Sequence, residues 1–106
     1  MKLYTYLDRL NMDKTKVNPS AKFLDGLNGS CSGICFYNSL KYEVPGCHDD
    51  QEGFYVIEGS GTVLMGDTEA EVRPDMAILL PPRTKHSFKR NPDSVPIKVF
   101  WFHAAI

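Results

Sequence analysis

A histidine and a glutamate lie four residues apart in the stretch GCHDDQEGFYVIEG, which runs from Gly46 to Gly59. If the chain is extended there, this even spacing places the side chains of His48 and Glu52 on one face of a strand. A helix would also align them, but Pro45 before the pair and the β-branched and aromatic residues after it disfavour a helix. A neutral imidazole and a carboxylate together suit zinc, iron, manganese, nickel or copper. The pair therefore predicts part of a metal site.

His86 is the candidate third ligand, because it follows the apolar run AILLPPRTK and opens the next predicted strand, KHSFKR. Two histidines and one carboxylate form a facial set that leaves positions open for water or substrate. Cys47 could add a thiolate only if a twist or bulge at Pro45 and Gly46 turned it to the side of its neighbour. Without a metal, His48 and His86 would be polar side chains that line a small-molecule pocket, and this alternative stays open.

A catalytic site also needs a group that moves a proton, and Asp49, Asp50 and Tyr55 are the candidates beside the histidine–glutamate pair. The two aspartates could instead be solvated, or could accept a hydrogen bond from a ligand histidine. His103 is predicted to be a core or rim histidine, with a place in the pocket as the alternative. The basic residues within 85–90 form a solvated rim or attract an anionic substrate, such as a sugar acid or phosphate.

The elements that must position these groups are short β-like runs, separated by turn residues, that begin at about position 20. They lie at residues 21–27, 32–44, 52–59, 61–66, 69–74, 76–82, 85–90 and 96–105. Such regular, short spacing favours an antiparallel sandwich or barrel. The segment before Pro19 could be a short helix, because Leu3, Leu7 and Leu10 share a helical face, or an edge strand.

Alternation within two runs predicts which side chains point inward, because every second residue of a strand shares a face. The run at 52–59 carries apolar groups on both faces, so we expect it to lie between the barrel interior and a second layer, either the other sheet or another subunit. One face holds Glu52, Phe54, Val56 and Glu58, and the other holds Gly53, Tyr55 and Ile57. In the run at 96–105, Lys98 marks the outer face, so the inner face holds Ile97, Val99, Trp101 and His103.

The bulk composition excludes several classes of protein. A chain of 106 residues with 42% hydrophobic residues suffices for one domain, 1–106, with an N-terminal extension at 1–19. Its net charge of -1 gives no reason to expect a nucleic-acid partner. No apolar run approaches the roughly 18 to 20 residues that span a bilayer, and no signal peptide is visible, so we expect a cytoplasmic protein without a membrane partner. Three cysteines without a CxxC pair argue against disulfides, and we expect Cys31 and Cys35 to pack in the core.

The two histidine-bearing stretches resemble the two motifs of the cupins, in their small single-domain conserved-barrel form. The first, at about 45–59, matches with Glu52, the six residues that follow it and Gly59, and His48 falls on the second histidine of the motif. The second, at about 74–91, has Asp75, Pro81, His86 and Asn91 in matching places. The resemblance covers residue 30 onward. It implies a double-stranded β-helix, or jelly-roll barrel, whose mouth holds a metal, and commonly a homodimer.

The departures from the motifs concern the metal site. Gly46 stands where the first motif has its other histidine, so one of the four usual ligands is missing. Two glycines of the second motif correspond most nearly to Pro74 and Arg83. The resemblance then implies a site of His48, Glu52 and His86, which would bind a metal less tightly than four ligands do.

The function expected from this sequence is a small metal-binding cupin that acts on or binds a small oxygen-rich molecule, with the metal as Lewis acid. The ion would be divalent zinc, iron, manganese or nickel. An enzyme of this kind would be isomerase-like, lyase-like or dioxygenase-like. The alternative is a non-catalytic domain that senses a carbohydrate or another small molecule, with a degenerate metal site or none.

Overall fold

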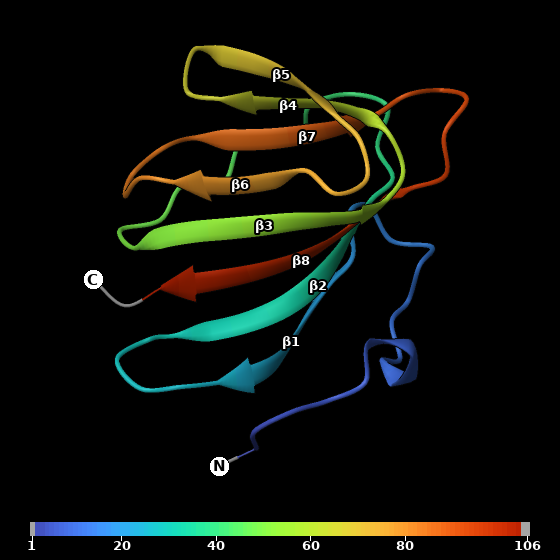
Figure 1. Ribbon diagram of the computed structural model, residues 1–106. Coiled ribbons are helices and arrows are strands. Elements are labelled where there is room, and N and C mark those ends of the chain that lie inside the picture. Colours follow the sequence, from blue (N-terminus) through green and yellow to red (C-terminus); the bar gives the residue numbers. More distant parts are fainter. Residues whose placement is uncertain (1, 105–106) are drawn as a thin grey trace.

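Two antiparallel sheets make up the fold in the computed structural model, which describes residues 2–104. The larger sheet has the strand order β1-β2-β8-β3-β6 and the smaller has β5-β4-β7 (Figure 1). The strands are β1 (Ser20–Asp25), β2 (Cys31–Tyr37), β3 (Gln51–Glu58), β4 (Gly61–Met65), β5 (Thr68–Val72), β6 (Ala77–Leu80), β7 (His86–Arg90) and β8 (Ile97–Ala104). The predicted all-β jelly roll, a double-stranded β-helix, is confirmed. Ala105, the last residue of the predicted run 96–105, lies outside the described residues.

The core lies between the sheets and is built from the alternate residues of each strand that point inward. Its fully buried side chains include Phe54, Phe88, Ile97, Val56, Val63, Val72 and Val99. Cys35 packs in the same cluster, as predicted, and burial raises the pKa of its thiol to about 12. The thiol is therefore neutral at ordinary pH and serves as a small apolar side chain.

The alternation predicted for β3 and β8 is confirmed except at one position. Phe54 and Val56 are buried while Tyr55 between them is exposed, and Val99 is buried on the inner face of β8. Glu58 was expected to share the inner face, but the register between β3 and β8 shifts between Val56 and Glu58. This bulge turns the end of the strand, and Glu58 is exposed.

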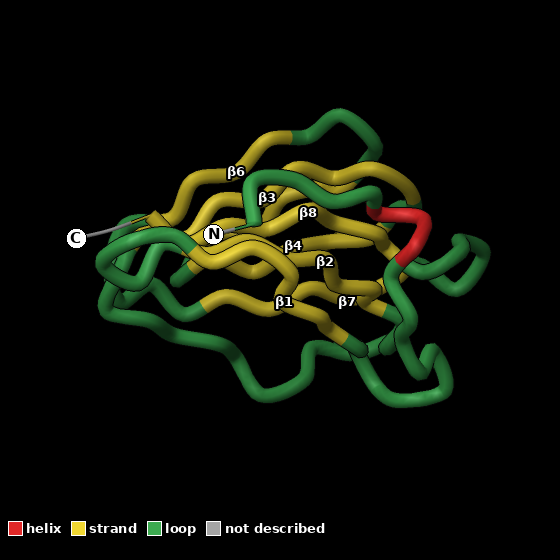
Figure 2. Tube along the Cα trace, turned by 90° about the horizontal axis from the view of Figure 1, so that it is seen from below, coloured by secondary structure: helices red, strands yellow, loops and turns green. Residues whose placement is uncertain are grey.

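Two segments differ from the sequence-based expectation. The strand expected over 32–44 ends at Tyr37, because the backbone N–H groups of Asn18 and Asn38 each donate to the side-chain Oδ1 of the other, at 3.0 Å. This reciprocal pair ties the N-terminal segment to the end of β2 in place of further strand pairing. The N-terminal segment was expected to be a short helix or an edge strand, and its described residues form one three-residue 3-10 turn, η1 (Leu7–Arg9), coloured red in Figure 2, and no strand. No helix of the described residues is long and apolar enough to cross a membrane.

Candidate metal centre

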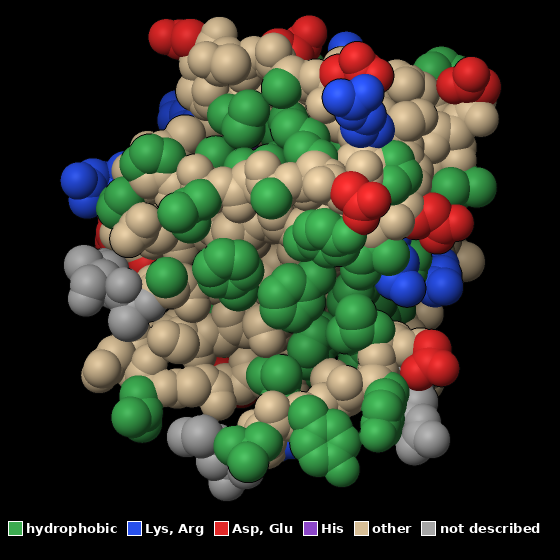
Figure 3. Space-filling model, in the orientation of Figure 1, with side chains coloured by type: hydrophobic (Ala, Val, Ile, Leu, Met, Phe, Trp, Pro, Cys, Tyr) green, Lys and Arg blue, Asp and Glu red, His purple; other side chains and the backbone are tan. Residues whose placement is uncertain are grey.

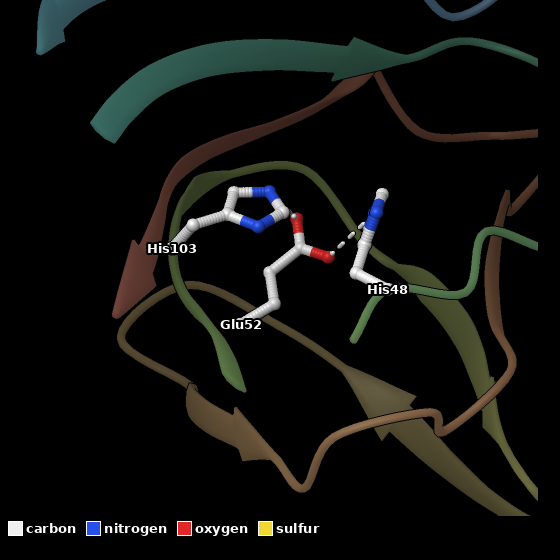
Figure 4. A group of neighbouring side chains, drawn as sticks. All are labelled: His48, Glu52 and His103. Carbon is white, nitrogen blue, oxygen red and sulfur yellow. Dashed lines mark ion pairs between the residues drawn. The ribbon is translucent and has the colours of Figure 1, made fainter. Parts of the chain in front are cut away.

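Glu52 is the centre of a group of three histidines at one end of the sheets. It is the second residue of β3, points inward and is buried. Its Oε1 lies 3.3 Å from His48 Nε2 and 3.1 Å from His86 Nε2. Its Oε2 lies 3.4 Å from His103 Nε2. Figure 4 shows the carboxylate of Glu52 between the rings of His48 and His103.

Backbone pairing from separate parts of the chain brings the histidines to this glutamate. His86 opens β7 and forms a two-way bridge with Gly46, whose N–H donates to His86 O at 2.9 Å and whose carbonyl accepts from His86 N at 3.0 Å. The loop after Gly46 carries His48, whose carbonyl accepts from Arg83 N at 2.6 Å. The register of β3 with β8 then places His103 directly beside Glu52. The side chains of His48 and Glu52 therefore lie on the same side, as their even spacing predicted, although His48 is in a loop and not in a strand.

One oxygen of Glu52 is the least satisfied polar atom of the site. Oε1 is fully buried, and none of the described residues makes a hydrogen bond of normal geometry to it. The two Nε2 atoms near it are within ion-pair distance. A buried carboxylate oxygen without a partner is costly, and a cation bound among these atoms would satisfy it.

The outer nitrogens of two rings fix their tautomers in the form that a metal requires. His86 Nδ1 lies 3.2 Å from the carbonyl of Thr84, which can only accept, so Nδ1 carries the proton and Nε2 faces the site with its lone pair. His103 Nδ1 likewise lies 3.0 Å from Asp50 Oδ1. Neutral imidazoles of this tautomer present Nε2 as a ligand atom.

A proton on Nε2 of His86 would prevent this nitrogen from acting as a metal ligand. Burial by itself lowers the pKa of His86, but the interactions with Glu52 and with the Thr84 carbonyl outweigh burial and raise its pKa above the ordinary value. The pKa of Asp50 is lowered, chiefly by its hydrogen bond with His103. In the absence of a cation, the buried negative charge of Glu52 therefore attracts a proton to the site.

The ligand atoms of His48, Glu52 and His103 all lie within 4.8 Å of one another and could hold a metal ion. Of these, the sequence indicated His48 and Glu52 as ligands, but His103 only as a core or rim histidine or as a lining residue. His103 was placed correctly on the inner face with Trp101. The sequence could not show that β8 pairs with β3 in the register that brings His103 to Glu52. His86, the other predicted ligand, is not part of this group of three, but its Nε2 lies 3.1 Å from Glu52 Oε1, the oxygen that His48 also approaches.

The structure separates the other candidates from the centre. Tyr55 is a correction: it lies on the outer face of β3, opposite to Glu52, and its hydroxyl donates to Asp75 Oδ1. Cys47 is exposed and lies outside the group of ligand atoms, so no bulge brings its thiol to the site. Asp49 is exposed, whereas Asp50 contacts His103 and takes the predicted role of hydrogen-bond acceptor.

The basic residues of 85–90 are also placed away from the site. Arg90 donates from its guanidinium to the backbone carbonyls of Asn38 and Ser94, at 3.1 and 2.8 Å. Lys89 lies over the ring of Tyr42, 4.7 Å from its centroid. Among the described residues, no lysine or arginine lines the cavity at the centre. The attraction of an anionic substrate by these side chains stays a prediction, and it would act from outside the cavity.

A cavity of about 380 Å³ opens from the centre into the space between the sheets. Gly46 borders it, and a Cβ at this position would lie 3.2 Å from His86 Nε2 and 3.8 Å from His48 Nε2. A side chain there would fill the approach to the ligand atoms. The missing histidine of the first motif thus leaves an open path to the centre.

Comparison with known proteins agrees with this architecture. A family model described as "Cupin domain" matches residues 42–103. The chain belongs to the cupin family. No curated protein sequence is similar enough to match this cupin.

Several solved structures share the fold. The cupin domain of Schizosaccharomyces pombe Cnp3 superposes with a TM-score of 0.82 at 13% identity, over 98% of this chain and 70% of that chain. Fe(II)-HppE with an alternative substrate gives 0.79 at 12%, over 97% of this chain and 60% of that chain. The polyketide cyclase RemF from Streptomyces resistomycificus gives 0.74 at 18%, over 97% and 80%. At these identities the likeness shows the fold alone.

Proposed function

We propose that this cupin binds a divalent transition-metal ion with His48, Glu52, His86 and His103, and holds a small oxygen-rich molecule beside it. The observation that carries the proposal is the buried Oε1 of Glu52, which has imidazole nitrogens on two sides and accepts no hydrogen bond from the described residues. His103 supplies a fourth donor in place of the side chain missing at Gly46. This set is more complete than the three ligands expected from the sequence.

The donor types favour some ions over others. Imidazole nitrogens with one carboxylate suit zinc, iron, manganese, nickel or copper, whereas calcium and magnesium prefer sites made of oxygen. Cys47 is exposed and is not in the group of ligand atoms, so the proposed site has no thiolate ligand. Fe(II) is present in the HppE structure, which has a similar fold, and this supports iron as one of the ions to test.

A bound ion would polarise an oxygen of the substrate as a Lewis acid. Other residues of the chain would orient the ligand rings and leave room for the substrate. Asp50 holds the ring of His103, the backbone of Thr84 holds the ring of His86, and the absence of a side chain at Gly46 leaves room for the molecule to reach the centre. The buried setting of Glu52 limits the access of water to the carboxylate.

The alternative function is a cupin that binds a small molecule without turnover. The positions of the candidate proton-transfer groups favour this alternative. Tyr55 lies on the outer face, and Asp50 is hydrogen-bonded to His103. Of the three groups proposed from the sequence, only Asp49 is without such a partner, and it is exposed. A bound ligand that emerges chemically unchanged would support this alternative.

The test measures Co(II) and Zn(II) binding to protein first stripped of metal, with the visible spectrum of Co(II) as a report on its ligands. We expect about one equivalent to bind, and Glu52→Gln to weaken binding at least about tenfold, since the substitution removes the anionic ligand but keeps its shape. Glu58→Gln, at the exposed end of the same strand, is the matched control and should bind like the wild type. Occupancy below about a tenth of an equivalent, unchanged by Glu52→Gln, would exclude the metal site.

A further inference from the structure

Part of the cavity beside the metal centre is lined by residues of a different chemical character. Besides the ligand residues and Gly46, the lining includes Tyr37, Ser20 and Glu43. These three residues come from β2, β1 and the loop after β2, and none of them takes part in the centre. A molecule held at the metal therefore extends toward side chains that can select its other end.

The lining residues Tyr37, Ser20 and Trp101 are held firmly. The ring of Tyr37 stacks on Phe88, with 4.3 Å between centroids and 17° between planes, and Phe88 in turn contacts Phe54 at 5.2 Å. On another side, the indole N–H of Trp101 donates to Ser20 Oγ at 3.1 Å. The ring of Trp101 also meets the ring of His103 edge-on at 5.3 Å. Packed aromatic walls of this kind favour a ligand of fixed length and orientation.

The charge of the cavity differs from end to end. Glu43 Oε1 accepts a hydrogen bond from Ser39 Oγ at 3.3 Å, and no lysine, arginine or histidine of the described residues forms an ion pair with Glu43. Since no lysine or arginine lines the cavity in this part of the chain, the carboxylate of Glu43 gives the far end a negative charge. A divalent ion with Glu52 leaves the near end with a positive charge.

The hydroxyl of Tyr37 adds a neutral polar group. Burial raises the pKa of Tyr37 well above its ordinary value, so the hydroxyl keeps its proton and can both donate and accept a hydrogen bond. The cavity thus has one end that attracts anionic oxygens, an aromatic middle, and another end that attracts hydrogen-bond donors or a cation.

We infer, on the basis of the proposed function, that the substrate or ligand is a small dipolar molecule: chelating anionic oxygens at the metal, and an ammonium or hydroxyl group at Glu43. Glu43 is then the residue that determines specificity. A molecule with a second anionic group at its far end, such as a dicarboxylate, is excluded by repulsion from Glu43.

The experiment uses four probes that share an α-hydroxycarboxylate head and differ in the tail: isoserine (ammonium), glycerate (hydroxyl), lactate (methyl) and malate (carboxylate). Their binding to Co(II)-loaded protein is measured by calorimetry. We expect isoserine to bind tightest and malate weakest, with a difference of at least about tenfold between them. Glu43→Gln should reduce that difference, and Glu43→Lys should make malate bind more tightly than isoserine.

The controls separate this inference from the proposed function. Glu71→Lys, an exposed change on β5 outside the cavity, should keep the order of the four probes. Thermal melting confirms that each variant is folded, and Co(II) affinity is measured for each before the probes are added. Failure of the wild type to bind Co(II) overturns both ideas. Normal Co(II) binding overturns this inference alone if no probe binds, or if malate binds as tightly as isoserine.

Discussion

The imidazole of His103 lies between two carboxylates, with Nδ1 3.0 Å from Asp50 Oδ1 and Nε2 3.4 Å from Glu52 Oε2. Asp50 precedes β3 and Glu52 is its second residue, so one short segment of chain contacts both nitrogens of a ring from β8. Asp50 is thereby a positioning residue for a proposed ligand. Such carboxylates fix the tautomer and raise the basicity of the histidine that they hold.

The first prediction concerns Asp50. Asp50→Asn keeps the size of the side chain but removes the charge that holds the His103 N–H, and we expect Zn(II) affinity to fall by about tenfold. Asp49→Asn, the neighbouring exposed change, should leave the affinity unaltered. The measurement is competition with a chromophoric chelator at constant pH. Equal affinities of the two variants would show that Asp50 does not act through His103.

Much of the site was predictable from local patterns. The positions of all eight strands follow from the turn residues and alternation, and His48, Glu52 and His86 follow from spacing and motif. His103 as a candidate ligand did not, because its position beside Glu52 depends on the pairing of β3 with β8, two strands far apart in the chain. Pairing of this kind is fixed by packing of the whole barrel and leaves no local signal.

The error at Tyr55 has a different origin. Tyr55 was a candidate because it is close to Glu52 in the sequence. Alternation within β3 already places Tyr55 on the face opposite to Glu52, and this pattern is the better guide to its position. Glu58 shows the limit of the same rule. The bulge after Val56 inserts a residue into the strand, and no turn residue marks it.

The second prediction follows from the raised pKa of His86. Because the folded state binds this proton more tightly than the unfolded chain, the stabilisation is fully present below the unfolded value near 6.5 and is lost as pH rises through the folded pKa. Metal-free protein should therefore lose thermal stability over this window, whereas Zn(II) affinity should increase, since the metal needs the neutral ring. His86→Gln should make the thermal stability of the metal-free protein less dependent on pH. Melting curves of the metal-free wild type and of His86→Gln from about pH 5.5 to about pH 8.5 test this prediction. The same change of melting temperature with pH in both proteins would contradict it.

The third prediction compares adjacent residues of β3. Phe54 is 2% exposed and contacts Phe88, so Phe54→Ala should lower the free energy of unfolding by about 3 to 5 kcal/mol. Tyr55→Ala removes an exposed ring from the outer face and should cost less than about 1 kcal/mol. The same Tyr55 variant should bind metal like the wild type, because its side chain is on the other side of the sheet. Urea denaturation measures the first two values, and weaker metal binding by Tyr55→Ala would return Tyr55 to the list of candidates for the site.

The fourth prediction is the homodimer expected from the apolar residues on both faces of the strands. The outer face of the larger sheet exposes Tyr55, Leu79 and Phe102, from the adjacent strands β3, β6 and β8. Figure 3 shows hydrophobic side chains gathered across one face of the molecule. A contiguous apolar face of this kind favours a symmetric contact with a second copy.

Light scattering tests the association, with a mass near twice 11.9 kDa expected at high concentration. Leu79→Glu places a charge within the proposed contact and should shift the protein to the monomer. Val95→Glu is the matched control, because Val95 is similarly exposed, at 53% against 61%, but lies in the loop before β8. A wild-type mass of one chain, or equal dissociation by both variants, would exclude this face as the interface. Since the metal ligands point to the interior of the barrel, the Leu79→Glu monomer should still bind one metal ion per chain.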